Sequence, residues 1–236
     1  MRLLQINTEI KKDYAMKSPD MKWVDDYKHL REVGRNLNTE IINQLSKSAL
    51  TECAKKLGIV KNKTLLFNND EELSVLFDYC LYSYRRGGKN PIERYLENTP
   101  PSQNSDEMRL LQAMSQSYYS MFTIEEVYPE QGATIRDQIR KKKLFLMDIG
   151  IGKGGVLGML FAGRILPFAD YYMTSGAIIP LHDKGLIDEI MLIVKKFMTH
   201  KKQEGNLLFS SAHEAAFSAQ IIRAVLRAWA FDKRNA

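Results

Sequence analysis

The sequence contains few residues of the types that build metal centres and disulfide frameworks. Its 236 residues include two cysteines, Cys53 and Cys80, and four histidines. The cysteines are 27 positions apart, with no CxxC pair and no histidine at ligand spacing. Zinc sites need three or four convergent ligands, and disulfide scaffolds need a set of paired cysteines. We therefore expect no metal, no cofactor and two buried thiols.

Long hydrophobic runs are missing as well. No window approaches the roughly 20 consecutive apolar residues of a membrane span, and residues 1–17 contain no run typical of a signal peptide. Hydrophobic residues nevertheless make up 44% of the chain and charged residues 26%, which is the composition of a globular protein with a sizeable core. The sequence thus predicts a cytoplasmic protein that has no membrane contact.

The positive charge is unevenly distributed. The formal net charge is +6, of which residues 1–118 contribute +2 and residues 119–236 contribute +4. Residues 132–164 alone contain seven lysines or arginines and two aspartates. An anionic partner is therefore expected first at this segment.

Apolar residues recur at helical spacing in the first half of the chain. They predict one helix over residues 20–57, and capping residues or a proline predict three more, over 69–84, 91–98 and 105–118. Residues 63–67 predict a strand or an extended link.

The helical spacing of apolar residues ends at Tyr119. Short segments rich in β-branched and aromatic residues follow, separated by turn residues, and they predict a compact antiparallel sheet or a small barrel. These segments are 120–129, 133–139, 142–149, 156–166 and 171–181. Two helices are expected at the end, over 186–200 and 211–231.

The predicted fold class is α+β, with an N-terminal helical region, a central small antiparallel sheet or barrel, and C-terminal helices. We place the boundary between a helical region, 1–118, and a β-barrel-like unit with two helices, 119–236. Because the last two helices are strongly apolar, they either cover the sheet or pair between subunits. A homodimer is therefore one expected assembly.

A series of short motifs runs through residues 49–167. The pattern D-Y is followed by G-x-N-x-I-E-R-Y, L-L-Q-A and S-x-F-x-I, and a β-rich half ends in a G-x-L-x-A-R-like segment. In this order the chain resembles a family of uncharacterised bacterial proteins. The likeness rests on Asp78-Tyr79, Gly88, Asn90, Glu93-Arg94-Tyr95, Leu110 to Ala113 and Gly132. The resemblance implies a helical part attached to a small β-barrel, and it implies no activity. The chain departs from the family pattern at Gly154-Gly155, where other members tend to have Gly-Asp before the apolar strand.

The glycine-rich stretch Gly150–Gly155 is not a good phosphate-binding loop. With Gly152-Lys153 as the Gly-Lys pair, the required earlier glycine falls on Met147 and the magnesium ligand falls on Gly154. The GxGxxG spacing is present, but the acidic residue of a βαβ unit is not. We interpret the stretch as a tight hairpin-like loop whose glycines adopt positive φ.

Two basic clusters are the candidate binding residues. The first is Arg136, Arg140, Lys141, Lys142 and Lys143, followed by Lys153; the second is Arg85, Arg86 and Lys89. With exposed aromatics such as Tyr128, Tyr171 or Tyr172, a basic barrel face would bind RNA or DNA by phosphate contact and base stacking. The competing interpretation is a solvated turn whose lysines prevent edge pairing between sheets.

No catalytic residues are identified. Asp148, at a strand end beside the glycines, is the acid best placed for a site, but no partner for it is evident. The sequence therefore favours a non-catalytic nucleic-acid-binding or regulatory protein. The alternatives are a small-molecule-binding enzyme with a pocket near Asp148 and Gly150–Gly155, and a protein-interaction scaffold.

Overall fold

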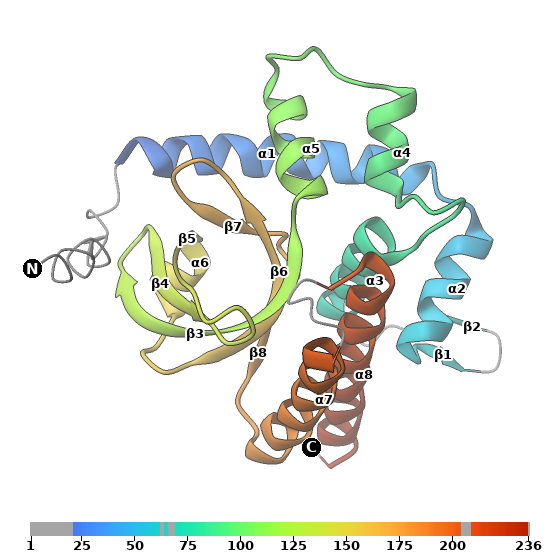
Figure 1. Cartoon of the computed structure of the whole chain (residues 1–236), viewed down its shortest axis with the longest axis vertical. Helices are drawn as coiled ribbons and strands as arrows, with labels where there is room; N and C mark the ends of the chain where they lie inside the picture. The colour runs from blue at the N-terminus through green and yellow to red at the C-terminus, as the bar shows by residue number, and fades with distance from the viewer. Residues whose placement is uncertain (1–20, 62–63, 66–68, 204–208, 236) are drawn as a thin grey trace, which may run out of the picture.

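The computed structural model describes residues 21–61, 64–65, 69–203 and 209–235 (Figure 1). The helices are α1 (Met21–Asn43), α2 (Lys47–Leu57), α3 (Asp70–Ser83), α4 (Pro91–Asn98), α5 (Asp106–Ser115), α6 (Ile149–Gly154), α7 (Lys184–Gln203) and α8 (Ser211–Asn235). The strands are β1 (Val60–Lys61), β2 (Thr64–Leu65), β3 (Tyr118–Tyr128), β4 (Gly132–Asp137), β5 (Lys143–Met147), β6 (Leu160–Pro167), β7 (Tyr172–Thr174) and β8 (Ile179–Leu181). The α+β prediction is confirmed.

Five strands close into a small barrel. Their order is β3-β4-β5-β7-β6, and β6 pairs back with β3, so that β3 has a neighbour on each side. All these pairs are antiparallel except β5 with β7, and β8 adds to β6 outside the ring. Large apolar side chains fill the interior, among them Phe122, Ile135, Leu146 and Phe161. Closure leaves little exposed strand edge.

Helices cover the barrel on two sides. On one side α2, α3, α7 and α8 enclose an apolar core with Tyr119 and Met121 of β3. On the other side α1, α3, α4 and α5 share a core with Phe145 and Met147 of β5. In Figure 1, α1 crosses one end of the barrel while α7 and α8 lie beside the opposite end. The boundary at residue 118/119 stays a prediction, although helices from both segments share these cores.

The single helix expected over residues 20–57 is wrong. The chain leaves α1 after Asn43, and α2 begins after Ser46, whose Oγ accepts a hydrogen bond from the amide of Ala49 at 3.2 Å. Apolar residues recur at helical spacing on both sides of this break, so their spacing did not reveal it. Gly58 ends α2 in the left-handed region, which glycine adopts without a steric penalty. Of the predicted extended segment 63–67, the described residues Thr64–Leu65 form a strand, and the rest lies outside the described residues.

The hairpin-like loop expected at Gly150–Gly155 is also wrong, because the stretch folds as the short helix α6. Asp148 caps it by accepting a hydrogen bond from the amide of Ile151 at 3.2 Å, and none of its glycines has positive φ. Gly152 and Gly155 allow close approach of the backbone instead. A Cβ on Gly152 would lie 2.8 Å from the carbonyl oxygen of Tyr128, and one on Gly155 would lie 2.5 Å from the carbonyl oxygen of Ile151. The helix thereby presses Ile151 into the barrel interior. Cys53 and Cys80 are buried free thiols, as expected.

Gly152→Ala should destabilise the protein by about 1–3 kcal/mol, because the added methyl group would overlap backbone atoms that cannot rotate away. Gly154→Ala in the same helix is the matched control, since its Cβ would meet nothing within 4 Å and alanine favours a helix. Urea unfolding of both variants measures the difference. Equal free energies of unfolding would contradict the proposed role of close approach.

Candidate functional site

The first basic cluster lies on the barrel, and most of its cations have a carboxylate partner. Arg136 and Lys143 both pair with Glu125, at 3.8 Å for Lys143. Arg140 lies 3.7 Å from Asp137, and Lys153 lies 3.2 Å from Glu130. Lys141 and Lys142 are exposed on the β4–β5 connection and form no ion pair with the described part of the chain. These two lysines are the free cations of the cluster.

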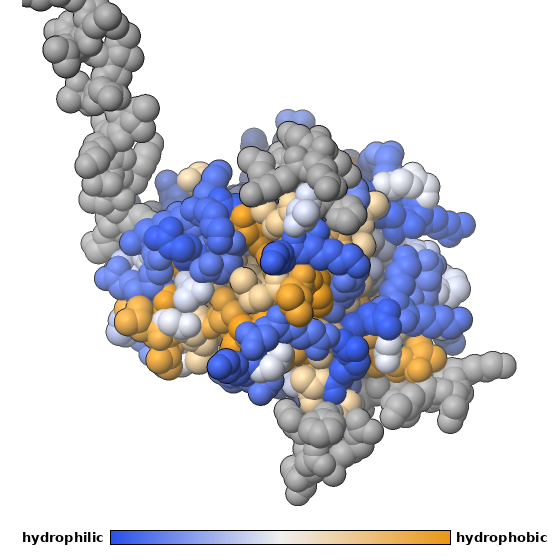
Figure 2. Space-filling view, turned by 60° about the horizontal axis from the view of Figure 1, so that its bottom comes forward, coloured by the Kyte–Doolittle hydropathy of each residue, from blue (hydrophilic) through white to orange (hydrophobic). Residues whose placement is uncertain are grey.

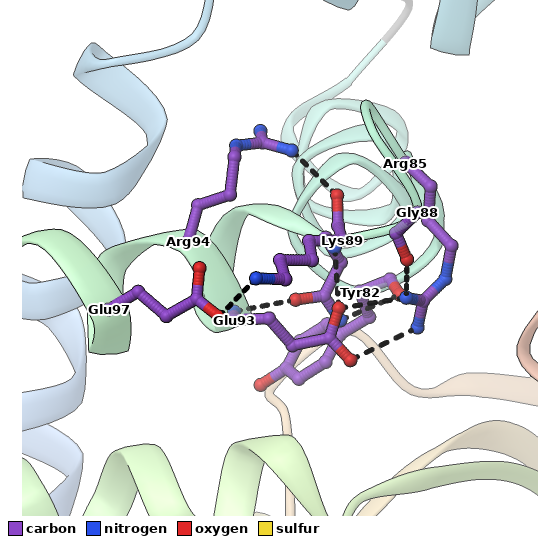
Figure 3. Close-up of polar contacts among 8 residues, drawn as sticks. Tyr82, Arg85, Gly88, Lys89, Glu93, Arg94 and Glu97 are labelled. Carbon is purple, nitrogen blue, oxygen red and sulfur yellow. Dashed lines mark hydrogen bonds and ion pairs between the residues drawn. The ribbon is translucent and has the colours of Figure 1, made fainter.

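The second basic cluster surrounds the turn between α3 and α4 (Figure 3). Arg85 points toward Glu93 and donates to its carboxylate at 2.8 Å, and it also donates to the carbonyl of Gly88 at 2.7 Å. Lys89 pairs with Glu97. Arg86 is exposed and has no ion pair with the described residues. In Figure 1 the α3–α4 turn and the β4–β5 hairpin lie apart, so the two clusters do not form one surface.

Of the three aromatic side chains expected to be exposed, Tyr171 is buried against α1 and the other two are half-buried. Tyr171 is 3% exposed, and its ring centroid lies 5.9 Å from that of Trp23 in α1. Tyr128 and Tyr172 are half-buried, and Tyr128 packs on Phe145. The prediction of an exposed Tyr171 is therefore wrong. Sequence reasoning missed this contact because Trp23 lies almost 150 positions earlier in the chain.

Asp148 also differs from expectation, because two side chains donate hydrogen bonds to it in addition to the amide of Ile151. Thr174 donates to its carboxylate at 2.8 Å and Arg31 of α1 does so at 3.2 Å. Arg31 donates to the hydroxyl of Thr174 at 2.6 Å as well. This closed network attaches α1 to the end of the barrel. Asp148 is therefore a structural link between α1 and the barrel.

A polar cavity, which we call the Arg164 cavity, lies where α3, α4, α5, β6 and α8 meet. Its volume is about 180 Å³. Two cations and two carboxylates line it, together with several hydroxyl and amide groups: Arg85, Arg164, Glu93, Glu214, Tyr82, Ser83, Asn90, Ser115, Ser117 and Ser211. Its fixed charges are therefore balanced.

Arg164 is the deepest of these charged groups. Its side chain is 3% exposed, and Nη1 donates to Glu214 at 2.7 Å and to Ser117 Oγ at 3.4 Å. The guanidinium lies 4.4 Å from the ring centroid of Tyr82, and Nε lies 3.8 Å from Oδ2 of Asp78. Sequence reasoning missed Arg164 as a site residue; the signal was a lone cation within the apolar strand FAGRIL.

Several buried polar groups in or beside the cavity have no hydrogen-bond partner among the described residues. The Nε atoms of Arg85 and Arg164 are buried and have no hydrogen-bond partner, and the hydroxyl of Tyr119 behind Arg164 has none either. Burial raises the pKa of the Asp78 carboxyl, while the charge of Arg164 acts in the opposite direction. Burial also raises the pKa of Tyr82. Such unsatisfied and perturbed groups are typical of functional sites.

The α3–α4 turn positions Arg85 and Glu93. Gly87 and Gly88 both have positive φ, at 61° and 81°, which is the backbone of a type I′ turn. Asn90 and Glu93 then form a reciprocal capping box at the start of α4, with hydrogen bonds of 2.8 and 2.7 Å. The turn and the cap therefore fix the carboxylate that holds Arg85.

Comparison with known proteins identifies a family. Residues 21–215 match a family of unknown function (DUF7986). The chain belongs to this family. No curated protein and no solved structure matches the chain. The resemblance to an uncharacterised family with helices and a small barrel is thus confirmed at this level, and three residues that carry it, Asp78, Asn90 and Glu93, lie at or beside the Arg164 cavity.

Two further findings concern membrane-spanning helices and metal ligands. None of the helices in the described ranges combines the length and apolar character that a membrane-crossing segment needs. Within the same ranges, no three histidine, cysteine, aspartate or glutamate side chains are placed to hold a metal ion.

The raised pKa of Asp78 gives stability a defined pH dependence. Because the folded protein binds this proton more tightly than the unfolded chain, ionising Asp78 costs stability as pH rises from its ordinary value, 3.8, through the raised folded value. Asp78→Asn cannot ionise and avoids this cost. The loss of stability caused by Asp78→Asn should therefore be larger at pH 4.5 than at pH 7.5, as measured by urea unfolding; a loss independent of pH would contradict the shift.

Proposed function

We propose that the chain is a non-catalytic binding protein for a small zwitterionic metabolite of amino-acid size, held in the Arg164 cavity. The size follows from the volume. An engineered cavity of about 150 Å³ in another protein holds one benzene molecule, so about 180 Å³ accommodates a ligand of similar bulk. The balanced charges favour a ligand that carries one charge of each sign.

The observation that carries this proposal is the pair of arginines in the cavity wall, whose guanidinium donors are only partly used. Both Arg85 and Arg164 line the cavity, and each already pairs with one glutamate through its terminal nitrogens. An arginine has five N–H donors in a fixed fork. A ligand carboxylate can therefore accept from the remaining donors while the glutamates stay in place. The same glutamates can accept from a ligand ammonium group.

Binding is favoured over catalysis by the hydrogen bonds of two hydroxyl groups in the cavity wall. The hydroxyl of Ser115 donates to the carbonyl of Gln112 at 2.8 Å, and that of Ser117 donates to the carbonyl of Met114 at 2.6 Å. A serine nucleophile needs a neighbouring base that accepts its proton. The hydroxyl groups of these two serines donate hydrogen bonds to backbone carbonyls, so they have a structural role in the wall of the Arg164 cavity.

A panel of the 20 common amino acids tests the proposal by thermal unfolding. A ligand at 100 times its Kd adds about 2.7 kcal/mol of stability, which corresponds to a rise in Tm of several degrees for a chain of this size. Arg85→Gln should abolish the shift. Arg94→Gln is the control, because Arg94 points away from Glu93 in Figure 3 and binds the carbonyl of Lys89.

Two results would reject the proposal. Either no amino acid shifts the Tm of the native chain, or Arg85→Gln and Arg94→Gln respond equally to the amino acid that does.

Nucleic-acid binding is a second candidate, supported by the free lysines and by the barrel topology. The strand order, closed by β3 with β6 and with α6 between the third and fourth barrel strands, is the connectivity of the OB-fold, whose members include oligonucleotide-binding proteins. This is an analogy of topology and identifies no site by itself. Such proteins use the face of the second and third strands. Here α1 packs on that face through Trp23 and Phe145, so phosphate contacts at Lys141 and Lys142 are the proposed mode.

A charge-reversal pair tests this second candidate. If phosphate contacts at the β4–β5 hairpin hold a single-stranded oligonucleotide, Lys141→Glu/Lys142→Glu should weaken binding at low salt far more than Lys55→Glu/Lys56→Glu on α2, which changes net charge equally. Fluorescence anisotropy over a salt series measures both. Absence of binding by the native chain at about 50 mM salt, or equal losses in the two variants, would exclude the hairpin.

A further inference from the structure

Helix α7 has an exposed apolar face that the described residues of its own chain do not cover. One side of α7 packs on α8 through Ile187, Ile190 and Phe197. On the other side Met191 is 46% exposed and Leu192 is 68% exposed. These two residues line a shallow hollow of about 570 Å³ with Asp188, Val194 and Lys195. Figure 2, which brings the bottom of Figure 1 forward, shows an apolar area bordered by hydrophilic residues.

The charges at the two ends of this hollow indicate what covers it. Asp188 and Lys195 are both exposed, and neither has an ion-pair partner among the described residues. They are seven positions apart, two helical turns, and therefore lie on the same face. Met191 and Leu192 lie between them, so the hollow is acidic at one end, apolar in the middle and basic at the other end.

This pattern is complementary to itself under two-fold rotation. If two copies of α7 cross antiparallel at the midpoint between Met191 and Leu192, Asp188 of each copy faces the partner subunit's Lys195, and the apolar residues meet at the centre. A parallel arrangement would place like charges opposite each other. Two-fold, self-complementary interfaces are the commonest in homo-oligomers.

We propose that α7 is a homodimer interface in which two copies of this chain pair antiparallel through Asp188, Met191, Leu192 and Lys195. The Arg164 cavity opens elsewhere and uses none of these residues. The dimer is therefore independent of the proposed ligand. Its energy comes from burying Leu192 and Met191, and the two ion pairs set its register.

Sedimentation equilibrium of the full chain tests the dimer. The native protein should sediment at twice the chain mass of 27.2 kDa at micromolar concentration, and Leu192→Asp should weaken association at least about tenfold, because it buries a charge without a partner. Leu157→Asp is the control; Leu157 is the most exposed large apolar residue described, at 71%, and lies outside α7. A monomeric native chain, or equal effects of the two variants, would overturn the proposal.

Charge variants test the pairing. Asp188→Lys makes both ends basic and Lys195→Asp makes both ends acidic, so each variant alone should dimerise at least about tenfold more weakly than the native chain. A one-to-one mixture of the two variants should regain association, and the double variant Asp188→Lys/Lys195→Asp should dimerise like the native chain. Circular dichroism confirms that each variant is folded. If neither the mixture nor the double variant regains association, the proposed pairing is overturned.

Discussion

The buried guanidinium of Arg164 is the constraint on which the arrangement of helices around the barrel depends. It belongs to β6, yet its partners come from α3 and α8, through Asp78 and Glu214. A buried charge that loses a partner typically costs about 3–5 kcal/mol. Both helices must therefore be in place before the outer side of β6 can be buried. The cluster adds little net stability, because desolvation offsets much of the attraction, but it determines which helix faces contact the barrel.

The opposite side of the barrel is fixed by a different kind of contact. Trp23 packs on Phe145 and Tyr171, and Arg31 closes a hydrogen-bonded network with Asp148 and Thr174. Both contacts use side chains of α1, so this helix covers the face that a barrel of this connectivity leaves open. The Arg164 cavity lies at a different place, the junction of β6 with the surrounding helices.

The sequence predicted what depends on neighbouring residues. Caps at Asn69 and Ser105 and the β-rich change of period at Tyr119 all correspond to observed elements. The contacts that failed to be predicted join distant positions: Trp23 with Tyr171, Arg31 with Asp148, and Arg164 with Asp78. Local spacing carries no information about such pairs. The prediction of a loop at Gly150–Gly155 failed for a related reason. Close approach to Tyr128 and a positive φ both require glycine, and only the fold shows which of the two requirements applies.

Four basic residues on the barrel and the two arginines of the cavity are paired with carboxylates, but the pairing has different consequences in the two places. An exposed pair such as Arg136 with Glu125 is worth about 0–1 kcal/mol, so a phosphate can displace the glutamate at little cost and also gains little, since water screens the contact. Arg164 is shielded from water, where the same charge interacts several times more strongly. One contact with Arg164 therefore contributes more binding free energy to a ligand than one contact with an exposed cation contributes to a polyanion. The number of cations in a segment is consequently a weaker guide to function than their burial, and this favours the Arg164 cavity over the hairpin.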